Sequence, residues 1–136
     1  MNLRKIFSAL DVGLVFVAVL SLIVASGFVE ARTGDCYVDT GKSDWNWTIR
    51  VWIHAVWDDN GVIIPELSDA GYEAHGGTGV SCALIGSEQV INTYIVYQSV
   101  TAKFTPAIGS PWTIKVFAWV SSPNNPQQYD FGWAYV

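Results

Sequence analysis

The sequence predicts an all-β protein: an antiparallel, immunoglobulin-like β-sandwich of about six or seven strands, preceded by one apolar helix. Apolar residues recur at every second position through most of residues 32–136, which is the period of a half-buried strand. Asn, Gly and Pro separate these runs at hairpin spacing. The 136 residues, 51% of them hydrophobic and 14% charged, suffice for one core and leave little room for a second domain.

Residues 1–31 differ in chemistry from the rest of the chain. Arg4 and Lys5 precede an uncharged run of eighteen residues, 12–29, that is apolar on every helical face. Basic residues ahead of an apolar run keep the N-terminus in the cytoplasm while the following chain crosses the membrane. The sequence therefore predicts that residues 32–136 are exported to the cell surface or the extracellular medium.

Two interpretations of this apolar run remain open. The run either belongs to a secretory signal peptide, with small-x-small cleavage sites ending at Gly27 or Ala31, or is retained as a single-pass helix. Eighteen helical residues reach about 27 Å, just short of a hydrocarbon core of about 30 Å. The predicted organisation is thus residues 1–31, a signal peptide or a membrane or filament anchor, and residues 32–136, an extracytoplasmic β-sandwich.

The first strands of the domain follow from alternation. Across residues 45–57 every odd position is apolar and most even positions are polar, which predicts one long half-buried strand. The turn sequence Asp-Asp-Asn-Gly at residues 58–61 ends it, and residues 62–64 are predicted to return as its hairpin partner until a proline stops the pairing. Residues 65–79 are predicted to be irregular, with one short helical turn at residues 66–70.

The second half of the domain is richer in β-forming residues. Residues 80–85 predict a short strand and residues 90–104 a long one. Asn92 and Gln98 interrupt the apolar face of the long run, which predicts a bend or a bulge midway. Residues 112–120 and 129–135 alternate in the same manner and predict the last two strands.

Cys36 and Cys82 are the only cysteines, and both lie in the part of the chain predicted to be exported. An oxidising compartment and an even count favour one disulfide between them. Closing a loop of about 47 residues would stabilise the domain by roughly 4 kcal/mol through the lost entropy of the unfolded chain.

The aromatic content, with seven Trp, six Tyr and six Phe, is the most unusual feature of the composition. Trp52 and Trp119 fall on the face opposite the more apolar one of their strands, and Tyr97 and Phe117 can join them in an exposed aromatic patch. Such patches serve sugar rings, partner proteins or a membrane interface. The other interpretation is that both faces of a central strand are buried and Trp52 belongs to a second layer of core.

Other motifs predict little chemistry. A zinc site needs three or four ligands, so His54 and His75 are interpreted as surface residues, and no metal, cofactor or catalytic set is predicted. Residues 58–61 are interpreted as a hairpin turn rather than a calcium loop. Asn46, followed by Trp47 and Thr48, fits the acceptor pattern for N-glycosylation. The net charge of -5 excludes a basic nucleic-acid-binding protein.

An apolar N-terminal helix that runs directly into a small β-sandwich resembles the architecture of archaeal type IV pilins and related surface-filament subunits. The resemblance covers overall architecture only, and it implies a helix retained in a filament core with the β-domain displayed outside. We predict a non-catalytic extracytoplasmic structural or interaction protein, a subunit of a surface filament, a surface layer or a membrane complex. The alternative is a secreted carbohydrate-binding or adhesive module that uses exposed aromatic residues.

The predicted partners are further copies of this chain or other protein subunits, and glycans under the alternative. The odd positions of residues 129–135 are all aromatic, more apolar area than one strand of a small monomer readily buries. At a sheet edge this strand would pair with another chain. Residues 12–29, if retained, would add contacts with the membrane or with other helices.

Overall fold

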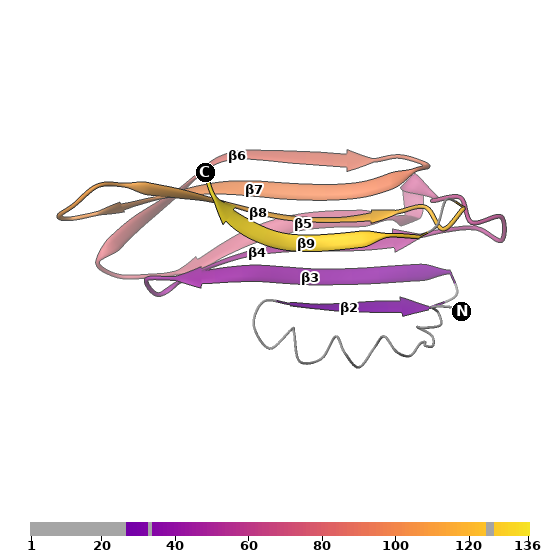
Figure 1. Ribbon diagram of the computed structural model, residues 1–136, viewed down its shortest axis with the longest axis horizontal. Coiled ribbons are helices and arrows are strands. Elements are labelled where there is room, and N and C mark those ends of the chain that lie inside the picture. The colour runs from indigo at the N-terminus through magenta and orange to yellow at the C-terminus, as the bar shows by residue number, and fades with distance from the viewer. Residues whose placement is uncertain (1–26, 33, 125–126) are drawn as a thin grey trace.

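The computed structural model describes residues 27–32, 34–124 and 127–136 (Figure 1). The described chain forms two antiparallel sheets of four strands each, and the two sheets pack face to face with a shared apolar core. The prediction of an all-β sandwich is confirmed. The predicted N-terminal helix or signal peptide falls mainly on residues 1–26, which lie outside the described residues.

Each sheet consists of strands that follow one another in the chain. The first sheet contains β2 (Gly27–Arg32), β3 (Asp35–Asp44), β4 (Trp47–Val56) and β5 (Asp69–Gly76), with the 3-10 turn η1 (Pro65–Leu67) between the last two. The second contains β6 (Val80–Ile91), β7 (Ile95–Pro106), β8 (Trp112–Ser121) and β9 (Tyr129–Tyr135).

This connectivity differs from that of an immunoglobulin domain, in which Greek-key connections carry the chain between sheets repeatedly. Here the described chain changes sheets at residues 77–79, between β5 and β6, and every other connection joins neighbours within one sheet. Most of these connections are short turns, such as residues 45–46 and 92–94, and a tight turn joins only adjacent antiparallel strands. The longer connection at residues 57–68 also returns to the neighbouring strand of the same sheet. The predicted immunoglobulin-like topology is therefore replaced by two consecutive meanders.

The structure contains more strands than the six or seven predicted, because β2, β3 and β5 carry weak sequence signals. Within β3, Asp, Gly and Lys residues obscure the alternation, although Cys36, Val38 and Thr40 all face the core. Strand β2 begins at Gly27, so the sheet starts inside the segment that the sequence assigns to residues 1–31. Val29 of this strand is buried in the core.

Two other details of the predicted strands differ from the structure. Residues 62–64 form no strand, and only Ile63 pairs in an isolated bridge with Trp57. The long run 90–104 is broken at residues 92–94, where the Asn92 side chain accepts hydrogen bonds from the next backbone amides. The bulge lies in β6, between Leu84 and Gly86, and not at Gln98.

The core is formed by the inward-facing side chains of both sheets, and the predicted alternation of residues 49–55 is confirmed there. The fully buried apolar residues of the central strands are Ile49, Val51, Ile53 and Ala55 on β4, Val96, Val100, Ala102 and Phe104 on β7, and Ile114, Val116, Ala118 and Val120 on β8. Burying one Val, Ile or Phe side chain contributes about 1.5–3 kcal/mol, so these three strands carry most of the hydrophobic stabilisation.

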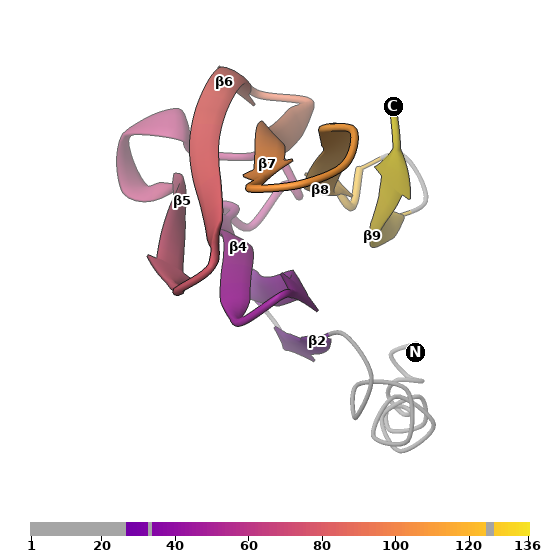
Figure 2. The ribbon, with the colours of Figure 1, turned by 90° about the vertical axis from the view of Figure 1, so that its left-hand side faces the viewer.

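The sandwich has two ends of different character. The Trp45 end carries the β3–β4 hairpin, residues 77–79 and residues 107–111, at the left of Figure 1 and toward the viewer in Figure 2. The Asp58 end, opposite, carries residues 57–68 and residues 92–94. Figure 2 also shows β6 and β9 at the two edges of the second sheet, in agreement with the strand order.

Candidate functional site

The structure brings together three of the four residues predicted to form an aromatic patch. Tyr97 on β7 pairs directly with Trp119 on β8, and Phe117 lies two residues further along β8. All three are half-buried and occupy the outer face of the second sheet, because the intervening residues of both strands face the core. Phe117 lies over Gly132 of β9, the residue with which it pairs.

Trp52 lies elsewhere, on the outer face of the first sheet and thus on the opposite side of the molecule. Its indole ring covers Gly71 of β5, the residue with which it pairs. A Cβ atom at Gly71 would come within 2.6 Å of Cζ2 of Trp52, so glycine is required for this packing. The ring is half-buried, and Trp52 forms no part of the core.

Beside Trp52, Arg50 is held between two carboxylates from neighbouring strands. Its Nε and Nη2 atoms donate to Oδ1 and Oδ2 of Asp39 at 2.9 and 2.6 Å, and its Nη1 atom donates to Glu73. The hydrogen bonds to Asp39 and Glu73 raise the pKa of Arg50 above its usual value, and the bond from Arg50 lowers the pKa of Glu73. The guanidinium is therefore permanently charged and engaged in ion pairs that tie β3, β4 and β5 together.

Two further side chains on the outer face of the first sheet, Tyr37 and His54, lie next to the ion pairs of Arg50. Tyr37 donates to Asp39 at 3.3 Å, and burial, followed by the nearby carboxylate, raises the pKa of its hydroxyl. The rings of Tyr37 and His54 meet edge to face at 6.3 Å. Sequence patterns did not reveal this network, because its members come from three strands and meet only through strand register.

Both histidines lie on this outer face, as partners of acidic residues. His54 Nε2 is 3.2 Å from Oδ2 of Asp35, and His75 Nε2 is 3.1 Å from Oε1 of Glu73. The described residues contain no group of three or more His, Cys, Asp or Glu side chains that could hold a metal ion. Each histidine therefore contacts one carboxylate, His54 that of Asp35 and His75 that of Glu73.

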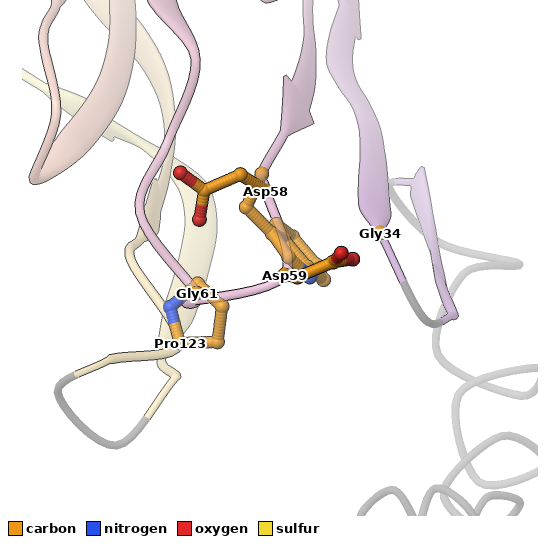
Figure 3. Close-up of a pocket in the computed structure, with 6 residues that line it drawn as sticks. Gly34, Asp58, Asp59, Gly61 and Pro123 are labelled. Atoms are coloured by element: carbon orange, nitrogen blue, oxygen red, sulfur yellow. The ribbon is translucent and has the colours of Figure 1, made fainter.

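A shallow hollow of about 220 Å³ lies at the Asp58 end (Figure 3). It is lined by Gly34, Trp57, Asp58, Asp59, Gly61 and Pro123. The carboxylates of Asp58 and Asp59 point in different directions in Figure 3. Oδ1 of Asp58 accepts from the backbone amides of Asn60 and Val62 at 2.8 and 3.1 Å, which is the geometry of a turn-forming aspartate. The hollow therefore presents a structural turn, as the sequence predicts for residues 58–61.

The predicted disulfide is wrong in this fold, because Cys36 and Cys82 are not joined and lie at opposite ends of the sandwich. Cys36 pairs with Ala55 near the Asp58 end of β4. Cys82 lies two residues beyond Val80, whose carbonyl accepts a hydrogen bond from Trp47 at the other end of β4. Eight strand steps separate Trp47 from Ala55, and Cys82 lies two steps closer, which leaves about 20 Å along the strands. The Cα atoms of a disulfide lie within about 7 Å of each other.

The Trp45 end holds an aromatic cluster that the sequence patterns did not indicate. Trp45 and Asn46 form a two-residue hairpin turn with positive φ angles of 49° and 66°, unusual for a tryptophan. Trp45 is 64% exposed, and its ring lies 6.2 Å from that of Trp112. Trp112 in turn stacks on Phe104 and donates its Nε1 hydrogen to Asp44 at 3.1 Å.

The alternation of residues 45–57 assigned Trp45 to the buried side of a strand, and the structure corrects this assignment. The two-residue turn removes Trp45 from the strand and places its side chain at the exposed tip. Asn46 is exposed at the same tip, in a position accessible to a modifying enzyme, although its glycosylation stays a prediction. The pattern lacked a Gly that would have indicated the turn.

No protein-family model, curated protein or solved structure gives a match to this chain. Within the described part of the chain, none of the helical segments has the length and apolar character needed to cross a membrane. The functional interpretation therefore rests on the surfaces described above.

Proposed function

We propose that this protein is a non-catalytic, extracytoplasmic structural or interaction subunit that assembles with further copies of itself or with other subunits through the edges of its second sheet. A surface filament, a surface layer or a membrane complex fits this role. The export of the domain is supported by the basic residues and the apolar run at the start of the sequence.

The observation that carries the proposal is the exposure of β6. This strand is twelve residues long, forms one edge of its sheet, and contains no Lys, Arg or Pro. Ile85 is 56% exposed, and Leu84 is 41% exposed although it is in register with the buried Ala102. The first sheet therefore leaves the middle of β6 uncovered, while it contacts the strand near its ends through Val80 and Gln89. Natural proteins protect sheet edges with charges, prolines and bulges, and here the bulge at residues 84–86 is the main protection.

The other edge, β9, contributes less apolar surface than its sequence suggests. Tyr129 and Phe131 pack against the core of their own sandwich. Trp133 and Tyr135 remain 37% and 63% exposed, and the ammonium group of Lys42 lies 4.2 Å from the Trp133 ring centre. We expect β9 to support association through its open backbone groups and these two rings, with β6 as the main contact.

The test compares two surface substitutions in the full-length protein. Ile85→Lys places a charge on the β6 edge, and Leu67→Lys places the same charge at a matched site, 60% exposed, in η1. Light scattering should show oligomers for the unmodified chain and for Leu67→Lys, and a shift toward monomer for Ile85→Lys. A monomeric unmodified chain, or equal behaviour of the two variants, would contradict assembly through β6.

A second candidate function is binding of carbohydrate on the outer face of the second sheet. The specific observation is that Tyr97, Phe117 and Trp119 converge there, and adjacent aromatic rings on an open sheet offer stacking surfaces for sugar rings. Trp119→Ala should abolish binding in a glycan array, whereas Trp52→Ala, on the opposite face, should leave it unchanged. Loss of binding with both variants, or no binding at all, would speak against this function.

A further inference from the structure

The Trp45 end differs from the rest of the surface in the size and kind of its exposed apolar side chains. Ile108, in the β7–β8 connection, is 92% exposed, and Trp45 at the β3–β4 tip is 64% exposed. Tyr135, which pairs with Ile114 near the start of β8, is 63% exposed. These residues come from both sheets, and the contact between Trp45 and Trp112 joins the two tips. Trp and Tyr are the residues favoured at the boundary between membrane and water.

Charge is distributed unevenly between the two ends. The described lysines, Lys42, Lys103 and Lys115, all lie in the half of the sandwich nearer the Trp45 end, as their pairing partners show. The Asp58 end instead carries Asp35, Asp58, Asp59, Glu66, Asp69 and Asp130. Leu67 and Tyr94 are exposed there too, but among acidic groups. The lysine-rich, aromatic Trp45 end, which also holds Asp44, therefore contrasts with the Asp58 end, where the acidic residues outnumber Arg32.

The direction of the chain provides a third, independent observation. Strand β2 starts at Gly27, opposite Thr40, and runs toward the Asp58 end, where Arg32 pairs with Asp35. The described chain therefore enters the first sheet at the end of β2 that points toward the Trp45 end.

From these observations we propose that the Trp45 end is a membrane-contacting tip, with Trp45, Ile108 and Tyr135 at the interface of an anionic lipid surface and the acidic end directed away. The lysines would approach anionic headgroups, and the aromatic and aliphatic side chains would enter the boundary between headgroups and acyl chains. The strained backbone at Trp45 is consistent with a residue selected for display at the tip. This contact requires neither a particular partner protein nor the assembly proposed above.

The experiment places a reporter at each end of the full-length protein. In a Cys82→Ser background, Ile108→Cys and Asp59→Cys are labelled with an environment-sensitive fluorophore; Cys36 is buried and should stay unlabelled. With vesicles of phosphatidylglycerol and phosphatidylcholine, the emission at position 108 should shift to the blue, and that at position 59 should not. No shift at position 108, or equal shifts at both positions, would overturn the proposal.

A second measurement tests whether the lysines contribute to vesicle binding. It also distinguishes a membrane contact from self-association of the chain through the Trp45 end. Lys103→Gln and Lys115→Gln should each weaken binding to the anionic vesicles about fivefold, and Asp59→Asn should leave it unchanged. A blue shift at position 108 that follows protein concentration without vesicles would instead assign this end to self-association and refute the membrane contact. If Ile85→Lys no longer assembles but still binds vesicles, the membrane contact at the Trp45 end is independent of assembly through β6.

Discussion

Strands β6 and β7 are neighbours of equal length, twelve residues each, yet their surroundings differ almost completely. On β7 the inward-facing residues from Val96 to Phe104 are all buried. On β6 the residues between Cys82 and Ile91 are exposed on both faces. Their printed contact with the first sheet is the hydrogen bond from Gln89 to the carbonyl of Ala70 on β5, so the first sheet leaves most of this stretch uncovered. The comparison shows that sequence places a residue in a strand, whereas the number of layers around that strand decides what the residue contributes.

The largest effect that this comparison predicts is on global stability. Phe104→Ala on β7 removes a fully buried ring stacked on Trp112 and should lower the free energy of unfolding by about 3–5 kcal/mol. Leu84→Ala on the inner face of β6 should lower it by less than about 1 kcal/mol, since that side chain already contacts water. Urea denaturation measures both, and similar losses would show that β6 is covered in solution.

A smaller effect is expected at the polar contact between the two strands. Gln98 is buried in β7, donates to the carbonyls of Glu88 and Ser99, and accepts from Gln89 at 2.7 Å. Gln98→Ala removes a buried amide that makes three hydrogen bonds and should cost about 1–3 kcal/mol of unfolding free energy. Gln89→Ala, at the exposed side of the same contact, serves as the control and should lower the free energy of unfolding by less. A larger decrease for Gln89→Ala than for Gln98→Ala would contradict this expectation and show that the β6 side of the contact provides the stabilisation.

The two cysteines should contribute least to stability, but they should differ clearly in the reactivity of their thiols. Cys82 is half-buried on β6 and should react with a thiol reagent in the native protein, whereas Cys36 is fully buried and should react only after unfolding. Burial raises the pKa of the Cys82 thiol, so its reaction should require higher pH than that of an ordinary cysteine. Mass spectrometry after labelling at several pH values measures this, and equal labelling of both cysteines would contradict the fold at β3.

The candidate surfaces show how far sequence patterns reach. Alternation put Tyr97, Phe117 and Trp119 on the outward parity of their strands, and they do share one face. The same alternation grouped Trp52 with them, because parity does not say which of two sheets a strand joins. The place of Trp45 and the pairing of Cys36 with Cys82 were predicted wrongly for related reasons. A turn without glycine hid the tip of the β3–β4 hairpin, and the distance between two cysteines depends on strand order rather than on spacing in the chain.

The sequence by itself determined the all-β class, the strands β4, β7, β8 and β9, and the inward faces of β4 and β8, because side-chain alternation and turn residues are local properties. Only the tertiary structure decided the meander connectivity, the Arg50 network, the separation of Cys36 from Cys82 and the uncovered edge of β6. Those features depend on which strands become neighbours and how two sheets are offset, and such long-range contacts are set by the packing of the whole core rather than by any segment alone.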